Sequence, residues 1–462
     1  MERVFKRKIY QKLLEWKVQE TGKTALLIEG ARRVGKSTVV EEFARREYDS
    51  YLLIDFSIAS KATKALFEDI SNLDMLFTSL QLTYGVSLKP GKSLVIFDEI
   101  QKCPLARQAI KHLVRDGRYH YIETGSLLGI KMKKSPQNED DKILLPSEER
   151  RVCMYPMDYE EFRWALGDTA TIPLLKTMYD NKKSLGDDVN RKLMRDFRLY
   201  MLVGGMPQAV NEYLDSQDLS RVDRVKRGII ELYENDFYEL DPSGQTSMLF
   251  RAIPAQLSSN ASRYQVSSVI SGSRVERLLR PLAILKDSMT TNISYHANDP
   301  SAGLALHINT EQFKLFCHDT GLFVTLAFWD SDFTSNIIYQ KLLNDKLGAD
   351  LGYVFENVVA QMLVASGQKL FYHTWKMKNS TRNYEIDFLL TRESKICPVE
   401  VKSSQSSEHK SIDEFQKKFS ARILHRYLVH TKDLHKEQDM LCIPVYMTPF
   451  LSSHFAQMPL TM

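Results

Sequence analysis

A stretch of sixteen residues, residues 23–38, constrains the fold more than any other part of the chain. It reads KTALLIEGARRVGKST, which is typical of a buried strand followed by a loop between two glycines and the start of a helix. The loop has the phosphate-binding pattern Gly30-x4-Gly35-Lys36-Ser37. Its glycines let backbone N–H groups turn toward a phosphate, the lysine reaches the terminal phosphates, and the serine hydroxyl ligates Mg²⁺. A glycine turn without a ligand is the alternative, but such a turn would not require a strand directly before it and a helix directly after it.

A second polar site follows the apolar run SLVIF at residues 93–97. Asp98 and Glu99 come directly after it, at the carboxyl end of a predicted strand, where parallel sheets present their ligands. Such a pair alone is typical of a solvated turn, but beside a phosphate loop it fits phosphoryl transfer: Asp98 holds Mg²⁺ and Glu99 polarises the attacking water. Thr124 or Ser126, after the next apolar strand, is a candidate contact for the γ-phosphate or its water, although Thr-Gly-Ser is also an ordinary turn.

These motifs predict a nucleotide-binding domain at the start of the chain. Continuous apolar strands alternate with helical stretches from residue 25 to residue 125, which predicts an α/β domain with a parallel sheet and helices on both faces. We expect ATP and Mg²⁺ as cofactors. The expected nucleotide contacts are Gly30, Arg33, Gly35, Lys36, Ser37 and Thr38, and the expected Mg²⁺ contacts are Ser37 and Asp98.

Length and composition indicate a multidomain globular protein. A chain of 462 residues with 43% hydrophobic residues predicts about three domains with sizeable cores. We place them at 1–215 (nucleotide domain with a helical lid), 216–340 (connector) and 341–462 (C-terminal domain). The formal net charge is only +4, which neither indicates nor excludes a nucleic-acid partner with a local basic patch.

Cysteine usage and the absence of long apolar runs favour a cytoplasmic protein. The five cysteines are scattered and odd in number, and the eleven histidines show no pair at metal-ligand spacing, so the sequence predicts reduced thiols, no disulfide and no zinc site. The start, MERVFKRKIY, lacks the apolar stretch of a signal peptide, and no run approaches 18 apolar residues. We therefore expect no membrane span.

The last part of the sequence has residues typical of a metal-dependent nuclease. Glu356 lies on a predicted helix, and Asp387 is followed after twelve residues by Glu400-x-Lys402 on a predicted strand. Alternate strand residues share a face, so Glu400 and Lys402 lie side by side. We expect Asp387 and Glu400 to ligate Mg²⁺, Lys402 to orient a water and Glu356 to add an outer or second metal contact. An ordinary exposed strand face is the alternative.

The region between these domains contains a candidate DNA contact. Three short helical segments, the third at residues 274–286, precede alternating residues from 290 to 307, which predicts a winged helix-turn-helix. Its third helix would display Arg274, Arg277 and Arg280. Two interpretations stay open, because such units bind either DNA or another protein.

Several motifs together resemble one family of prokaryotic AAA+ ATPases. They are GARRVGKST, LVIFDEIQKCP, ETGS, MYPMDYEEF and YMLVGGMPQAV. In this family an ATPase module is followed by an uncharacterised C-terminal region, which ends in a restriction-endonuclease-like domain. The resemblance implies nucleotide and Mg²⁺ contacts at Lys36 and Ser37, an acidic pair at Asp98 and Glu99, and a sensor at Thr124.

Two further expectations accompany the resemblance. The C-terminal residues are similar to the PD-(D/E)xK nuclease superfamily, with Ile386-Asp387 in place of Pro-Asp. The charged segment 131–151 is typical of a solvated loop, but Arg150 or Arg151 at its end is a candidate arginine finger for a neighbouring subunit's nucleotide, which implies a homo-oligomer.

Two functional hypotheses follow. In the first, the chain is a Mg²⁺-dependent ATPase that couples its nucleotide state to DNA binding and to cleavage by the C-terminal domain. In the second, it is a regulatory switch in which ATP binding toggles assembly, and the nuclease-like fold only recognises DNA or protein.

Overall fold

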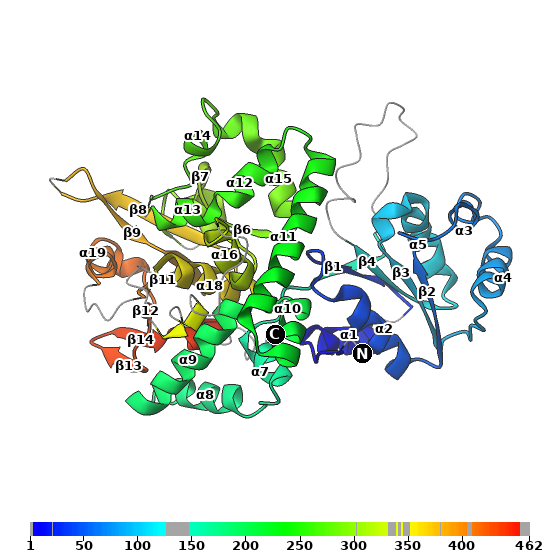
Figure 1. The fold of residues 1–462 in the computed structure, drawn as a ribbon, viewed down its shortest axis with the longest axis horizontal. Coiled ribbons are helices and arrows are strands. Elements are labelled where there is room, and N and C mark those ends of the chain that lie inside the picture. Colours follow the sequence, from blue (N-terminus) through cyan, green and yellow to red (C-terminus); the bar gives the residue numbers. More distant parts are fainter. Residues whose placement is uncertain are drawn as a thin grey trace. The chain divides into compact units, whose positions relative to one another are not determined.

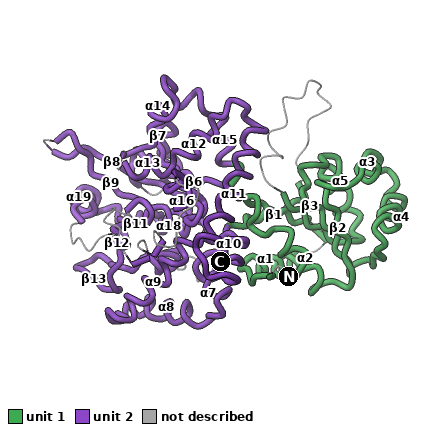
Figure 2. The backbone as a smooth tube through the Cα atoms, in the orientation of Figure 1, with its two compact units in different colours: residues 1–155, 287–289 green, residues 156–286, 290–462 purple. Residues whose placement is uncertain are grey.

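The computed structural model describes residues 3–20, 22–125, 147–259, 261–301, 303–330, 339–340, 343–344, 352–378, 380–403 and 409–452. The chain forms two compact units, which are residues 1–155 with 287–289, and residues 156–286 with 290–462 (Figure 2). The three-domain division with boundaries at 215 and 340 stays a prediction. Among the described residues, no helix combines the length and the apolar character that a bilayer crossing requires.

The first unit is built on five parallel strands, which confirms the predicted sheet (Figure 1). All four strand pairs are parallel and the order is β2-β3-β4-β1-β5, so the carboxyl ends of the strands meet at one edge. The predicted polar residues at the ends of β3 and β4 therefore lie at this edge. The strands are β1 (Ala25–Glu29), β2 (Ser50–Asp55), β3 (Ser93–Asp98), β4 (His120–Gly125) and β5 (Glu149–Cys153).

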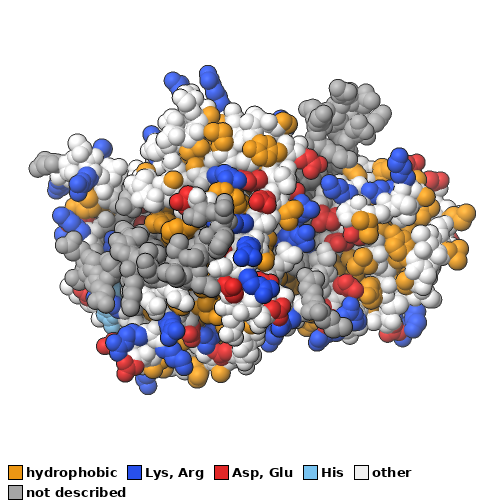
Figure 3. Space-filling model, in the orientation of Figure 1, with side chains coloured by type: hydrophobic (Ala, Val, Ile, Leu, Met, Phe, Trp, Pro, Cys, Tyr) orange, Lys and Arg blue, Asp and Glu red, His pale blue; other side chains and the backbone are white. Residues whose placement is uncertain are grey.

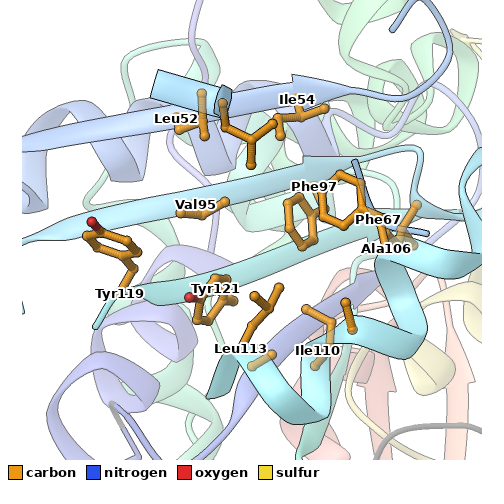
Figure 4. Close-up of a cluster of buried hydrophobic side chains, with 14 of the residues drawn as sticks. Leu52, Ile54, Phe67, Val95, Phe97, Ala106, Ile110, Leu113, Tyr119 and Tyr121 are labelled. Carbon is orange, nitrogen blue, oxygen red and sulfur yellow. The ribbon is translucent and has the colours of Figure 1, made fainter. Parts of the chain in front are cut away.

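Helices cover both faces of this sheet, as predicted. On one face, alternate strand residues such as Leu52, Ile54, Val95 and Phe97 face α4 and α5 in a buried apolar cluster (Figure 4). Helix α2 contacts β2, β3 and β4 without contributing to that cluster, and α1 packs against α2. The helices are α1 (Ile9–Gln19), α2 (Lys36–Glu47), α3 (Lys61–Ala65), α4 (Leu73–Tyr84), η1 (Ile100–Lys102) and α5 (Pro104–Asp116).

The second unit contains two sheets with helices around them (Figure 1). One has the order β7-β6-β8-β9 and the other the order β10-β11-β12-β14-β13. The strands are β6 (Thr291–Ala297), β7 (Ile308–Cys317), β8 (Phe371–Lys376), β9 (Asn383–Ile386), β10 (Phe388–Arg392), β11 (Lys395–Val401), β12 (Arg426–His430), β13 (His435–Glu437) and β14 (Met440–Pro444).

The helices of the second unit precede the sheets and also alternate with their strands. They are α7 (Tyr159–Ala165), α8 (Thr171–Asp180), α9 (Asp187–Val203), α10 (Pro207–Ser216), α11 (Leu219–Leu240), α12 (Gln245–Arg251), α13 (Ile253–Ser258), α14 (Val266–Val269), η3 (Val275–Leu278), α15 (Leu279–Asp287), η4 (Leu304–His307), α16 (Thr320–Ala327), α18 (Gly352–Ala365), α19 (Lys410–Phe419), η5 (Ser420–Arg422) and η6 (Val445–Leu451).

The connector differs from the expected winged helix in two details. The third helical segment is divided into η3 and α15, and the alternating stretch forms β6 while its hairpin partner is the later strand β7. Strand β6 also pairs in parallel with β8. The hairpin is therefore one half of a four-stranded sheet, because β6 pairs with β7 along one edge and with β8 along the other.

In this unit, two glycine-containing turns pack against each other, one with Gly204 and Gly205 and the other with Gly321. Their role could not be inferred from the sequence. A Cβ at Gly321 would lie 2.6 Å from the Cα of Gly204, and a Cβ at Gly205 would lie 2.8 Å from the nitrogen of Met157. Fully buried Asp319 accepts hydrogen bonds from the nitrogens of Gly205, at 2.6 Å, and Leu322, at 2.9 Å. The glycines are therefore required by backbone-to-backbone contact.

Candidate functional site

The phosphate loop joins β1 to α2, as its sequence predicts. Gly35 lies at the helix start with φ 95°, a left-handed conformation that glycine adopts without a steric penalty. Gly30 has no room for a side chain, because a Cβ there would collide with the carbonyl oxygen of Met154. Arg33 also has a positive φ, 70°, and its side chain is exposed, as is that of Thr38. The loop backbone is therefore held in a tight turn at the edge of the sheet.

Lys36 is the most confined charged group of this loop. Its side chain is buried, and Nζ donates hydrogen bonds to the carbonyl oxygens of Gly30, at 2.9 Å, and Ala31, at 3.0 Å. Burial lowers the pKa of the Lys36 ammonium, while the charges of Glu99 and Asp98 act in the opposite direction. The ammonium is thus fixed inside the loop, where it can attract an anionic group.

Three polar side chains from three elements meet at the carboxyl edge of the sheet. Ser37 Oγ, on α2, donates to Asp98 Oδ1, at the end of β3, over 2.8 Å. Thr124 Oγ1, near the end of β4, donates to the same carboxylate oxygen. A hydroxyl and a carboxylate are hard oxygen ligands of the kind that Mg²⁺ prefers, so these residues fit a Mg²⁺ ion.

Glu99 lies next to this group in a strained conformation. Its φ is 52°, in the left-handed region that costs a non-glycine residue about 1–3 kcal/mol. Its backbone N–H donates to Thr124 Oγ1 over 3.4 Å, and its carboxylate accepts from Gln101 Nε2. Strain of this kind concentrates at functional sites, and here it places a second carboxylate beside Asp98.

Arg7 is a contact that the sequence did not indicate. Its guanidinium donates to the carbonyl oxygens of Val34, at 2.7 Å, and Tyr155, at 2.6 Å. Val34 belongs to the phosphate loop, so this arginine fastens the loop from the segment before α1. A lone arginine near the start of a chain has no spacing signal, and only the fold shows the contact.

The two candidate arginine fingers lie on β5 and pair with carboxylates of their own chain. Arg150 pairs with Glu20, and Arg151 lies 2.9 Å from Glu149 and 3.7 Å from Glu29. Both side chains are about a third exposed, at 36% and 35%. The role of either arginine in a neighbouring subunit stays a prediction.

In the second unit, two predicted carboxylates and one unpredicted carboxylate converge. Ligand atoms of Glu356 on α18, Glu385 on β9 and Asp387 just after β9 lie within 4.8 Å of one another. Asp387 Oδ2 also accepts a hydrogen bond from the nitrogen of Val401 over 2.7 Å. Burial, followed by the charge of Glu356, raises the pKa of Asp387 well above its usual range. Glu385 lies two residues before Asp387, and this spacing could have predicted that the two side chains share a face.

Lys314 on β7 lies in the same cluster and was not predicted. Its Nζ lies 2.8 Å from Glu356 Oε1 and also pairs with Glu385. Burial opposes its charge, but attraction by Glu356 and Glu385 raises the pKa of Lys314 well above its usual range. Forty-two residues separate Lys314 from Glu356 along the chain, so no local pattern predicts the contact.

The predicted Glu400-x-Lys402 pair lies side by side on and directly after β11. Lys402 Nζ is 2.8 Å from Glu400 Oε1, and Glu400 Oε2 accepts from the nitrogen of Ile412 over 3.2 Å. Burial opposes the charge of Lys402, but Glu400 outweighs it and raises the pKa of Lys402. The charge of Glu400 also contributes to the raised pKa of Asp387. The structure therefore brings the four predicted residues Glu356, Asp387, Glu400 and Lys402 into one region.

The candidate DNA-contacting arginines are exposed. Arg274 precedes η3, Arg277 lies on it, and the acidic Glu276 lies between them. Arg280 donates to the carbonyl oxygen of Leu240 over 2.9 Å. On the face drawn in Figure 3, basic and acidic side chains are interspersed over the surface. Contact with DNA stays a prediction.

Comparison with known proteins supports an ATPase domain in the first unit. Residues 22–163 match the family model of an AAA domain. Residues 194–332 and 351–447 match two domains of unknown function, DUF8612 and DUF4143. A search of curated proteins finds no match to this sequence.

Two solved structures are similar at low identity. A Walker-type ATPase of Pyrococcus abyssi is 18% identical with a TM-score of 0.41, over 70% of this chain and 96% of that one. A signal transduction ATPase with numerous domains and a tetratricopeptide repeat sensor, from Pyrococcus horikoshii, is 11% identical with a TM-score of 0.26, over 79% of this chain and 46% of that one. The family match and the loop geometry agree that the first unit of this chain contains an AAA-type P-loop ATPase domain.

Proposed function

We propose that this chain is a Mg²⁺-dependent ATPase whose nucleotide state controls how its C-terminal region engages DNA. The first half of this proposal rests on one observation. Ser37, Asp98 and Thr124 converge beside the buried ammonium of Lys36. These groups belong to α2, β3 and β4, and phosphoryl transfer requires a metal carboxylate and a polar sensor at one sheet edge.

Each residue has a chemical role in this proposal. Lys36 neutralises the terminal phosphates of ATP, and Ser37 with Asp98 holds Mg²⁺, which offsets the charge on the phosphate oxygens. Glu99 accepts a hydrogen bond from the attacking water and orients it toward the γ-phosphate. Thr124, whose hydroxyl already contacts Asp98, keeps that carboxylate in position.

The test of this half is ATP turnover by the purified full chain with Mg²⁺. Lys36→Ala and Glu99→Gln should each lower the turnover rate by about 10²–10³-fold, the usual effect of removing one electrostatic group from such a site. Glu99→Gln should leave nucleotide binding in place. Lys89→Ala, at a surface lysine whose side chain is 59% exposed, is the matched control. Unchanged turnover in both site variants would remove ATP hydrolysis from the proposal.

The second half assigns nuclease chemistry to the C-terminal cluster. Glu356, Glu385 and Asp387 would hold a divalent cation, which would activate a water for attack on a DNA phosphodiester. Lys402 would stabilise the negative charge that develops on the phosphate oxygens. Asp387→Ala and Lys402→Ala should each eliminate metal-dependent DNA cleavage while ATP turnover stays intact. Cleavage that survives in both variants would come from a contaminating nuclease.

A regulatory switch is the second candidate function, and one observation favours it. The ammonium of Lys314 already pairs with Glu356 and Glu385, and the raised pKa of Asp387 disfavours its charged, metal-binding form. A cluster neutralised in this way is suited to a binding module that does not cut. ATP-dependent DNA binding by wild-type protein without any nicking in Mg²⁺ or Mn²⁺ would select this candidate.

The proposed partners have separate tests. Charge reversal at exposed Arg274 and Arg277 should weaken DNA binding and flatten its salt dependence, because fewer phosphate contacts release fewer counterions. No change in either quantity would make this surface a protein interface. Arg150→Ala or Arg151→Ala should lower turnover only at protein concentrations at which subunits assemble. An equal loss in dilute monomer would exclude an arginine finger acting between subunits.

A further inference from the structure

Three neighbouring strands in the second unit bring together two histidines and a cysteine. His430 ends β12, His435 begins β13, and Cys442 lies on β14. Their ligand atoms, two ring nitrogens and one sulfur, lie within 4.8 Å of one another. Figure 1 shows β13 and β14 side by side at this end of the sheet.

The strand register explains why the three side chains meet. His435 is directly opposite Cys442 in the antiparallel pair of β13 and β14, so their side chains share a face. Cys442 is also the partner of Leu428 on β12, and His430 lies two residues beyond Leu428 on the same face. The cluster is therefore a product of strand pairing.

The ring of His430 is buried, and no residue that the structure describes forms an ordinary hydrogen bond with it. The residue is 5% exposed, and neither ring nitrogen makes a hydrogen bond of ordinary geometry within the described part of the chain. A buried polar group without a partner costs about 1–3 kcal/mol, and a bound ion would supply the missing contact. Burial, followed by the charge of His435, lowers the pKa of His430 to about 4, so the ring is neutral near pH 7.

His435 has the orientation that metal-binding histidines usually show. Its Nδ1 lies 2.8 Å from the carbonyl oxygen of Asp433, which can only accept, so Nδ1 carries the proton. In the neutral ring, this leaves the lone pair of Nε2 free, and a backbone carbonyl is a common partner for the second nitrogen of a metal-ligating histidine. The rings of His430 and His435 stack with centroids 5.2 Å apart.

The loop between the two histidines is attached to the helical part of the same unit. Asp433 Oδ2 accepts hydrogen bonds from the nitrogens of Leu185 and Gly186, each at 2.7 Å, and Thr431 O accepts from Asn190 Nδ2 at 3.0 Å. By contrast, β13 has three exposed residues, and among the strands that the structure describes it pairs with β14 alone. An additional link at His435 would therefore fasten this short edge strand to the sheet.

We propose that His430, His435 and Cys442 bind one Zn²⁺ ion. Two imidazole nitrogens and a thiolate are ligands that zinc prefers, and a three-residue set leaves a fourth position for water or a further ligand. Tetrahedral zinc with bond lengths of about 2.0–2.3 Å places its ligand atoms about 3.3–3.7 Å apart, so side-chain rotation has to close the cluster by about 1 Å.

Zinc binding would displace the thiol proton of Cys442. Burial raises the pKa of this thiol to about 11, and the charge of Glu437 adds to the shift, so the group is protonated near pH 7. Zinc binds a cysteine as its thiolate, so the proton of Cys442 would leave when the ion binds.

The experiment uses the metal-stripped full chain, titrated with Zn²⁺ and, as a spectroscopic probe, with Co²⁺. Wild-type protein should bind one ion at this site, and the Co²⁺ form should show a sulfur-to-cobalt charge-transfer band in the near ultraviolet. His435→Ala removes an exposed ligand and so should not prevent folding. The His435→Ala variant should bind Zn²⁺ at least about 100-fold more weakly than the wild-type chain. This is the largest loss of metal affinity that is usual when only an outer-shell partner is removed.

Cysteine variants complete the test. Cys442→Ser should abolish the charge-transfer band, whereas Cys397→Ser, at a buried thiol on β11 of the same sheet, should keep it. A bound ion without a thiolate band, or unchanged Zn²⁺ affinity in His435→Ala, would overturn the proposal. Absence of both Zn²⁺ and Co²⁺ binding by the wild-type chain would overturn it equally.

Discussion

Replacing Lys314 with methionine tests whether the acidic cluster of the second unit is a cation site. Lys314 Nζ lies 2.8 Å from Glu356 Oε1 and also pairs with Glu385, and its side chain is only 6% exposed. Methionine keeps most of the apolar stem and removes the charge. Removing one partner of a buried ion pair costs about 3–5 kcal/mol, and the loss here should lie at or below the low end of this range because Glu356 and Glu385 are 15% and 24% exposed.

The loss of stability should depend on pH with a definite sign. The pKa values of Glu356 and Asp387 are already raised by burial in the folded protein, and loss of the ammonium raises them further. A carboxyl whose folded pKa exceeds its unfolded value, about 4, binds more protons when folded. Its contribution is therefore most favourable below the unfolded pKa and is lost as pH rises toward the folded pKa. The deficit of Lys314→Met should therefore be smallest at acidic pH, near the unfolded pKa of about 4, and grow as the pH rises.

Equilibrium urea unfolding at several pH values, with and without Mg²⁺, measures this deficit. A cation that binds only the folded variant restores about 2.7 kcal/mol at a concentration 100 times its Kd. Lys176→Met is the matched control, because Lys176 pairs with Asp180 on an exposed helix face and should cost at most about 0.5 kcal/mol. An equal loss at every pH, with no effect of Mg²⁺, would refute the interpretation of the cluster as a cation site.

Three further predictions follow from the packing around the two sites. Gly205→Ala should destabilise the second unit by about 3 kcal/mol or more in urea unfolding, since its Cβ would lie 2.8 Å from backbone nitrogen of Met157. Gly228→Ala, within α11 with open space around it, should be neutral or stabilising by up to about 1 kcal/mol, and a reversed order would contradict the packing argument. Arg7→Ala should raise the KM for ATP, because the contact that ties the phosphate-loop carbonyl of Val34 to the segment before α1 is lost, and unchanged steady-state kinetics would exclude this supporting role. Thr124→Val should lower kcat while nucleotide binding, measured by calorimetry, stays intact; equal loss of both would assign it a binding role.

The sequence predicted the parts of the fold in which local pattern and position coincide. Apolar strands ending in Asp98 and Thr124 had to place these residues at one edge, because parallel strands share their carboxyl ends. The Glu400-x-Lys402 spacing predicted a shared strand face, and the 2.8 Å contact between these residues agrees with it.

Contacts that depend on tertiary pairing could not be predicted. Lys314 enters the acidic cluster only because β6 and β7 join β8 and β9 in one sheet. The approach of Gly204 to Gly321 is equally non-local. The expectation of no zinc site considered spacing along the chain, whereas His435 and Cys442 meet through the pairing of β13 with β14.

Mg²⁺-dependent ATP turnover of Asp98→Asn tests the central claim most directly. Asparagine keeps the size of the side chain and removes the charge that would hold the ion beside Ser37. We predict that turnover falls by about 10²–10³-fold, while nucleotide binding without Mg²⁺ stays close to that of the wild-type chain. Turnover equal to that of the wild-type chain, with the same dependence on Mg²⁺, would contradict the assignment of this sheet edge as the ATPase site.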